Sequence, residues 1–279
     1  MVAPGGLTLW GPSVLPLSFS ERIVAAHAGG FSSTSLIPFE LRRAETSGQG
    51  LREIRAEFED AGIAIRVVDP LATWLPNFSP PPELREDDPV LGGYQPDEVF
   101  ALCHALGADL VTTLALFVPL LEVDAGAEHF AAVCDDAAEH GLRLQVEFIP
   151  GTGIPDIALT WEIVRRAGRA NGGLIVDSWH FFRSNPDFDL LASIPGDRIF
   201  SVQIEDAPAK PSENLAIESL HGRLVPGDGE LDLARFVAAL PETSSERLIG
   251  PEVFSDDLWQ LPADEIGRLL GERTRALLV

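Results

Sequence analysis

A rhythm of helix, glycine and short apolar run repeats along this chain and constrains its fold more than any other feature. It is seen in AHAGGFSSTSLI, DAGIAIRVVD, ALGADLVTTLAL, EHGLRLQVEFI and ANGGLIVDSW. A glycine at the end of a helix can take the left-handed conformation that turns the chain into the next strand. Strands that alternate with helices pair in parallel through right-handed crossovers. The rhythm therefore predicts an α/β protein with a parallel sheet.

Eight apolar segments fit strands of this kind. They lie at residues 7–10, 31–37, 63–69, 109–116, 143–149, 173–178, 199–205 and 247–253. Helices fit between them, the first with Ser18 or Ser20 as its N-cap and the last over 262–278. Eight units of about 35 residues are typical of a (β/α)₈ TIM barrel, predicted here as a single domain over residues 1–279. An open doubly wound sheet is the alternative, but no GxGxxG follows the first strand.

Two long segments follow predicted strands, at 70–95 and 207–229, whereas the connections that lead into strands are short. In (β/α)₈ enzymes the loops after the strands build the active site. We therefore expect these segments to form its walls or a lid, with insertions of no function as the alternative.

Four consecutive predicted strands carry an oxygen ligand near their carboxyl ends. These residues are Glu147, Asp177, Gln203 and Glu252. A carboxylate on a strand buried on both faces costs several kcal/mol unless it is paired or bound to a metal. The ends of parallel strands meet at one end of a barrel, so these groups are expected to converge.

Cationic side chains are scarce on the same strands. The segments carry only Arg143 and Arg247, both at the opposite ends. A divalent ion would supply the missing positive charge, and a set of oxygen ligands favours Mn²⁺ or Mg²⁺ over zinc. The alternative is that individual carboxylates cap helices or pair with arginines of the loops.

Two further residues are candidates for binding the substrate. His180 lies three residues after Asp177 and is expected at the same mouth of the barrel. Arg223 lies in the long segment after the seventh strand and could hold a hydroxyl, an oxyanion or a phosphate. A structural histidine and an ion pair that braces the loop are the respective alternatives.

The charge balance restricts the partners. With 20 Lys+Arg against 43 Asp+Glu the formal net charge is −23, which repels nucleic acid and anionic membranes. Cys103 and Cys134 have no CxxC spacing and are expected to be buried thiols in a reducing compartment. No signal peptide and no apolar run of about 20 residues is found, so the expected location is cytoplasmic.

Four motifs in order resemble the xylose-isomerase-like barrel superfamily, the sugar phosphate isomerases and epimerases that include ketose 3-epimerases and inosose dehydratases. They are HGLRLQVEF, IVDSWHFFRS, VQIEDAP with the downstream RLVPGDGELDL, and PEVF. The resemblance implies a metal bound by Glu147, Asp177, Gln203 and Glu252, with His180 and Arg223 at the substrate. One departure weakens the ligand set, since the family commonly has histidine where Gln203 stands.

The resemblance implies proton transfer next to a carbonyl group in a small, carbohydrate-like compound. The metal would stabilise an enediolate, with Glu147 and Glu252 as base and acid on opposite faces. The predicted activity is that of a keto-sugar isomerase or epimerase. One alternative is a lyase that dehydrates a keto-cyclitol or a dehydroshikimate-like acid, and another is an inactive barrel that serves as a binding subunit. Homo-oligomers are common in the family and are a further expectation.

Overall fold

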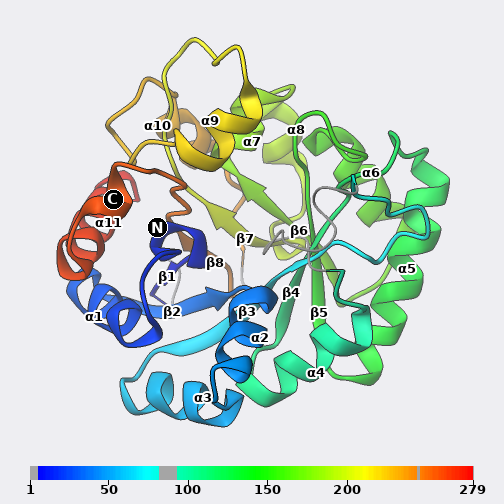
Figure 1. The fold of residues 1–279 in the computed structure, drawn as a ribbon. Coiled ribbons are helices and arrows are strands. Elements are labelled where there is room, and N and C mark those ends of the chain that lie inside the picture. The colour runs from blue at the N-terminus through cyan, green and yellow to red at the C-terminus, as the bar shows by residue number, and fades with distance from the viewer. Residues whose placement is uncertain (1–5, 82–92, 244–245, 279) are drawn as a thin grey trace.

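The computed structural model describes residues 6–81, 93–243 and 246–278, and these form a (β/α)₈ barrel (Figure 1). Eight parallel strands follow one another in sequence order around a single sheet. The strands are β1 (Leu7–Leu9), β2 (Phe31–Leu36), β3 (Ala64–Leu71), β4 (Leu110–Leu114), β5 (Arg143–Glu147), β6 (Gly172–Asp177), β7 (Ile199–Gln203) and β8 (Leu248–Gly250). Each overlaps one predicted strand, and the predicted TIM barrel is confirmed.

The helices surround the sheet. They are α1 (Phe19–Gly29), α2 (Pro38–Thr46), α3 (Leu51–Asp60), α4 (Pro96–Leu106), α5 (Val123–Glu139), α6 (Ile157–Ala167), α7 (Ser178–Arg183), α8 (Phe188–Ser193), α9 (Leu215–His221), α10 (Leu233–Ala239) and α11 (Ala263–Leu277). Short 3₁₀ turns lie at η1 (Gly11–Val14), η3 (Gly196–Arg198) and η4 (Leu258–Gln260). Ser18 is the N-cap of α1, because its hydroxyl and the Glu21 carboxylate form a reciprocal capping box.

The two expected loops are only partly irregular. Pro70 and Leu71 belong to β3 rather than to the following loop, and residues 82–92 of that loop lie outside the described part of the chain. The segment after β7 carries α9, which Figure 1 shows close to α7.

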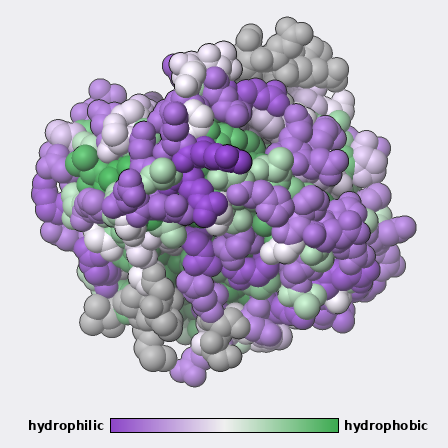
Figure 2. Space-filling model, turned by 90° about the horizontal axis from the view of Figure 1, so that it is seen from below, coloured by the Kyte–Doolittle hydropathy of each residue, from purple (hydrophilic) through white to green (hydrophobic). Residues whose placement is uncertain are grey.

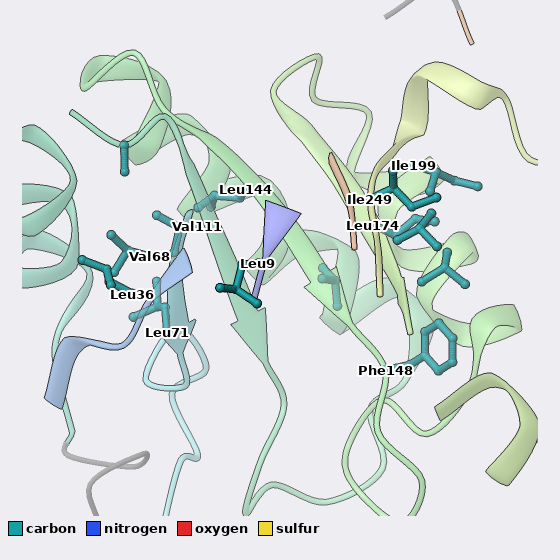
Figure 3. Packing of buried hydrophobic residues seen from close by; sticks show 14 of the residues in the cluster. Leu9, Leu36, Val68, Leu71, Val111, Leu144, Phe148, Leu174, Ile199 and Ile249 are labelled. Carbon is teal, nitrogen blue, oxygen red and sulfur yellow. The ribbon is translucent and has the colours of Figure 1, made fainter. Parts of the chain in front are cut away.

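The strands bury both faces, as a barrel requires. Leu36, Val68 and Val111 from β2, β3 and β4 gather on one side of the barrel, where they pack beneath the helices (Figure 3). The intervening residues point inward. They form a second, smaller hydrophobic cluster that fills the barrel: Trp10, Val67, Leu110, Ile175, Phe200 and Leu248.

The barrel closes between β8 and β1. The backbone N–H of Trp10 donates to the carbonyl of Pro251 at 3.4 Å. A Cβ atom at Gly250 would lie 1.7 Å from the carbonyl oxygen of Thr8, so only glycine permits this approach of the two strands. Outside the sheet, α1 and α11 lie side by side (Figure 1), and the Cβ position of Gly267 is 1.9 Å from the Ala25 carbonyl oxygen.

The face seen in Figure 2 is mostly hydrophilic, with small separate hydrophobic areas, in keeping with the acidic composition. Cys103 and Cys134 are free and buried, and burial raises the pKa of the Cys134 thiol to about 12. Within the described ranges, no helix has both the length and the apolar character needed to cross a bilayer.

Candidate metal and active site

Alternation along the strands turns four predicted site residues into the barrel. Gln203 on β7 pairs with Asp177 on β6 and with Gly250 on β8, and Glu252 lies two residues beyond Gly250. Glu147 ends β5 and pairs with Leu114 on β4. Paired residues of neighbouring strands share a face. The side chains therefore meet at the carboxyl end of the barrel, where the sequence placed them.

Direct contacts join these residues and His180 in two groups, which Arg223 links through Asp177 and Glu252. The Nε2 of Gln203 donates to Oε1 of Glu252 at 2.6 Å. The Nε2 of His180 lies 3.3 Å from Oε1 of Glu147 and 3.8 Å from Oδ2 of Asp177. All five side chains are at least nine-tenths buried. The cluster is thus a compact polar site enclosed by the barrel.

Asp177 has a structural role as well as a place in the site. Its Oδ1 accepts the backbone N–H of His180 at 2.6 Å and so caps α7. The cap fixes where α7 begins, and with it the direction of the His180 side chain. Its other oxygen, Oδ2, remains directed at the cluster.

Arg223 reaches the same cluster from the segment after β7. Its NH1 lies 2.7 Å from Oδ2 of Asp177, 3.3 Å from Oε2 of Glu252 and 3.7 Å from Oε1 of Glu205. The side chain is 2% exposed. The strands themselves bring no cation to their carboxyl ends, but this loop supplies one. The predicted shortage of positive charge is therefore partly met.

A surrounding frame holds Arg223 in place. Its Nε donates to the backbone carbonyl of Ser219 on α9 at 2.9 Å, and its guanidinium lies over the rings of Trp179 and Phe254. Glu218, the neighbour of Ser219, accepts from the Trp179 indole at 2.9 Å and from Arg183 at 2.6 Å. These contacts hold α9 against α7, so the role of Arg183 here is structural.

The turn that returns the chain from this loop depends on Asp206. Its Oδ1 accepts the backbone N–H groups of Ala207 and Leu231, and its Oδ2 accepts that of Gly227. Gly229 is required beside it, since a Cβ there would lie 2.4 Å from Oδ1 of Asp206. Asp206 therefore shapes the loop that carries Arg223.

Two carboxylates that sequence reasoning left out of the site belong to it. Asp69, near the end of β3, is 8% exposed and lies next to Thr112, since Val68 pairs with Val111. Glu205, just after β7, accepts from the backbone N–H of Trp179 at 2.6 Å and from the Ser178 hydroxyl at 3.0 Å. Asp69 ends an apolar run just as Glu147 does, so the same signal could have identified it.

Burial and mutual repulsion raise the pKa of three of these acids. For Glu252, burial and then the charge of Glu147 raise the pKa well above its usual range, against the opposing effect of Arg223. The pKa of Asp69 is raised by burial and by Glu147, and that of Glu205 by burial and by Asp177. The site thus holds more negative charge than its own cation balances.

Asp177 behaves differently from these three. Burial alone would raise the pKa of Asp177, but the neighbouring His180 and Arg223 outweigh it and hold that pKa below the ordinary value. Asp177 is therefore the carboxylate in the cluster most firmly kept in its charged form.

The residues present fit a divalent cation. Ligand atoms of Glu147, Asp177 and His180 lie within 4.8 Å of one another. The Oε1 of Gln203 is buried and accepts no hydrogen bond from the described residues. A bound cation would satisfy this oxygen by coordinating it. His180 was predicted at the substrate, yet it stands close enough to join the ligand set. These residues could hold a divalent metal.

Fold and site together define a TIM-barrel protein with an acidic centre at the carboxyl end of its strands. Residues 23–272 match the xylose isomerase-like TIM barrel family, and the chain belongs to that family. The resemblance predicted from the sequence is therefore confirmed.

Relatives within the family are enzymes. The 3-dehydroshikimate dehydratase of Pseudomonas aeruginosa is 30% identical over 249 residues, which cover 87% of this chain and 37% of that protein. The inosose isomerase of Bacillus velezensis is 28% identical over 183 residues, covering 63% of this chain and 64% of that protein. The chain spans about two-fifths of the length of the dehydratases that it matches. Among solved structures, the zinc-bound IOLI protein superposes with a TM-score of 0.81 at 18% identity and covers 98% of both chains.

Proposed function

We propose that this protein is a metal-dependent enzyme that moves a proton next to the carbonyl group of a small polyhydroxy compound. One observation carries the proposal: buried acids at the ends of β5 to β8 converge around the guanidinium of Arg223, and the Oε1 of Gln203 lacks a donor in the described chain. Such a cluster is costly to fold unless a cation or a ligand balances it.

The ligands proposed for the metal are those expected from the sequence: Glu147, Asp177, Gln203 and Glu252. Their oxygens favour Mn²⁺ or Mg²⁺. When bound, the cation supplies Lewis-acid polarisation of the substrate carbonyl.

The protein's own residues handle the proton. Glu147 and Glu252 approach from β5 and β8, and we assign one as the base that takes the α-proton and the other as the acid that returns a proton. His180 and Arg223 lie between them and bind substrate oxygens. Trp179 and Phe254, packed against Arg223, help to keep water from the reacting atoms.

Dehydration of a 3-dehydroshikimate-like keto acid is the reaction to test first. In it the base removes the α-proton, the bond from carbon to the β-hydroxyl breaks, and the acid protonates the leaving hydroxyl to give water and an unsaturated ketone. The dehydratase relatives match about nine-tenths of this chain. This favours the lyase over the isomerase or epimerase that the sequence first suggested. Isomerisation stays the second candidate, because inosose isomerases match more than half of the chain.

A substrate comparison in D₂O tests the proposal. Purified protein with Mn²⁺ is incubated with 3-dehydroshikimate and, separately, with an inosose, and each is followed by NMR. Loss of water from 3-dehydroshikimate supports the lyase. Exchange of one C–H, or a rearranged inosose, supports the isomerase. Neither change, together with no metal after purification without chelators, would leave the inactive binding barrel as the better account.

The other expectations remain parts of the proposal. A carbohydrate-like molecule is the proposed partner, and the net charge of −23 opposes binding of nucleic acid or an anionic membrane. Two free, buried cysteines are compatible with the proposed cytoplasmic location. A homo-oligomer is proposed only by analogy with the family.

A further inference from the structure

Asp69 stands apart from the other acids of the site. It comes from β3, whereas Glu147, Asp177 and Glu252 come from β5, β6 and the end of β8. Its side chain is on the inner face, because Val67, two residues earlier, belongs to the cluster that fills the barrel. Asp69, Glu147 and Glu252 stand near the carboxyl ends of their strands and therefore share the same mouth, and after burial the charge of Glu147 is the main cause of the raised pKa of Asp69.

No cation of the described residues compensates Asp69. Arg223 pairs with Asp177 and approaches Glu252 and Glu205, while Asp69 makes no ion pair within the described ranges. An unpaired carboxylate that is nine-tenths buried and faces other acids works against folding. A contribution to stability therefore does not explain Asp69, which indicates a functional role.

Polar side chains of the next two strands lie beside it. Val68 pairs with Val111, so the strand register sets Thr112 next to Asp69, and the Thr112 hydroxyl opposes the rise in the pKa of Asp69. The Nε2 of Gln145 donates to the hydroxyl oxygen of Thr112 at 3.0 Å, and both residues are fully buried. A carboxylate in this position that no cation of the described chain neutralises is a strong hydrogen-bond acceptor.

The site is consequently polarised. Positive charge and the proposed metal ligands lie toward β5–β8, and an acceptor lies toward β3. We propose that Asp69 binds a hydroxyl group of the substrate, accepting its hydrogen bond from the β3 side while the carbonyl end lies toward Arg223. This inference rests on the proposed function, and it adds that the substrate carries a hydroxyl on the side away from its carbonyl.

Asp69→Asn tests the assignment, because the amide keeps the shape and removes the charge. In the manganese-loaded protein with 3-dehydroshikimate we expect KM to rise about ten- to a hundredfold, as loss of a hydrogen bond to a charged group predicts, with kcat much less affected. Affinity for Mn²⁺ should be unchanged. The unfolding temperature should rise by about 2–4 °C, because an uncompensated buried charge is removed.

Two more variants serve as a second test and as a control for this interpretation. Thr112→Val removes the neighbouring hydroxyl at nearly constant volume and should raise KM in the same direction but less. Asp109→Asn is the matched control: this aspartate, at the other end of the barrel, is paired with Arg66 and Arg143, so its loss should lower the unfolding temperature and leave KM unchanged.

Several outcomes would overturn the assignment. An unaltered KM in Asp69→Asn would exclude substrate contact, and a loss of Mn²⁺ affinity would make Asp69 a metal ligand instead. A fall in unfolding temperature would show a structural role. If the wild-type protein acts on neither 3-dehydroshikimate nor an inosose, the proposed function fails. The change in unfolding temperature caused by Asp69→Asn would then still show whether the charge of Asp69 is uncompensated in the wild-type protein.

Discussion

The two ends of the barrel use the same acidic residues in opposite ways. At the amino end, Asp109 lies between Arg66 and Arg143, each within 2.8 Å, and Glu246 pairs with Arg66 at 2.9 Å. At the carboxyl end, a larger group of acids shares Arg223. The acids at the amino end are more than 40% exposed, and those at the carboxyl end are almost fully buried.

The pKa values follow this division. Burial would raise the pKa of Asp109, but its two arginines lower it, and the hydrogen bond from Arg66 lowers that of Glu246. At the carboxyl end, burial raises the pKa of Asp69, Glu205 and Glu252. One end is thus neutralised by the chain itself, and the other is left to be neutralised by something bound.

The largest expected effect concerns the two proposed acid–base residues. Glu147→Gln and Glu252→Gln should each lower kcat by about 10²–10⁴-fold, because proton transfer by a positioned carboxyl group contributes that much. Since each change also removes a buried negative charge, neither should lower the unfolding temperature. Steady-state kinetics and thermal unfolding measure the two effects, and near-wild-type turnover in either variant would refute the assignment.

Metal binding should stabilise the carboxyl end alone. Free Mn²⁺ at a hundred times its Kd should add about 2.7 kcal/mol to the free energy of unfolding, or about 5–10 °C in unfolding temperature, by mass action. A chelator should reverse the shift. Asp109→Asn should retain it in full, whereas Glu252→Gln should lose most of it. An equal response in both variants would show that manganese acts elsewhere.

The smallest expected effect is on how the free energy of unfolding of the metal-free protein depends on pH. The two ends of the barrel should contribute with opposite signs. Asp109 and Glu246 have lowered pKa values, so their stabilisation is present above the unfolded values, near 4, and is lost as the pH falls through the folded values. Glu252 has a raised pKa, so stability should fall as the pH rises from about 4.5 through its folded value. Each group can contribute at most about 1.4 kcal/mol per pH unit, the value for one full proton.

Variants assign the two slopes. Asp109→Asn should reduce the slope at acid pH and leave the slope nearer neutral pH unchanged, and Glu252→Gln should do the reverse. If the slopes at acid and at near-neutral pH change together in either variant, the two ends of the barrel are not independent.

Much of the fold was accessible from local sequence signals. The barrel followed from glycines that end helices and from the count of apolar runs, and strand ends differ by at most three residues from those predicted. The choice between Ser18 and Ser20 as N-cap needed coordinates, because both hydroxyls are followed by residues compatible with a first turn. Only the reciprocal contact between Ser18 and Glu21 decided it.

The site was accessible in part. Glu147, Asp177 and Glu252 were identified because an acid that ends an apolar strand conflicts with burial. Asp69 shows the same conflict, but the proline after it suggested that a loop begins there. The pairing of Arg223 with Asp177 joins residues 46 positions apart through the fold of α9, and no local pattern indicates such a contact.

The frame around Arg223 has a consequence for how the protein would respond to loss of the proposed metal. The guanidinium is bound to the main chain of α9 and lies over two aromatic rings, so its charge is permanent at that place. A lysine could not reproduce this, since its ammonium lacks the planar surface and the fixed fork of donors. An internal counter-ion therefore maintains the architecture of the mouth, and we expect loss of the proposed metal to abolish the proposed activity without unfolding the protein.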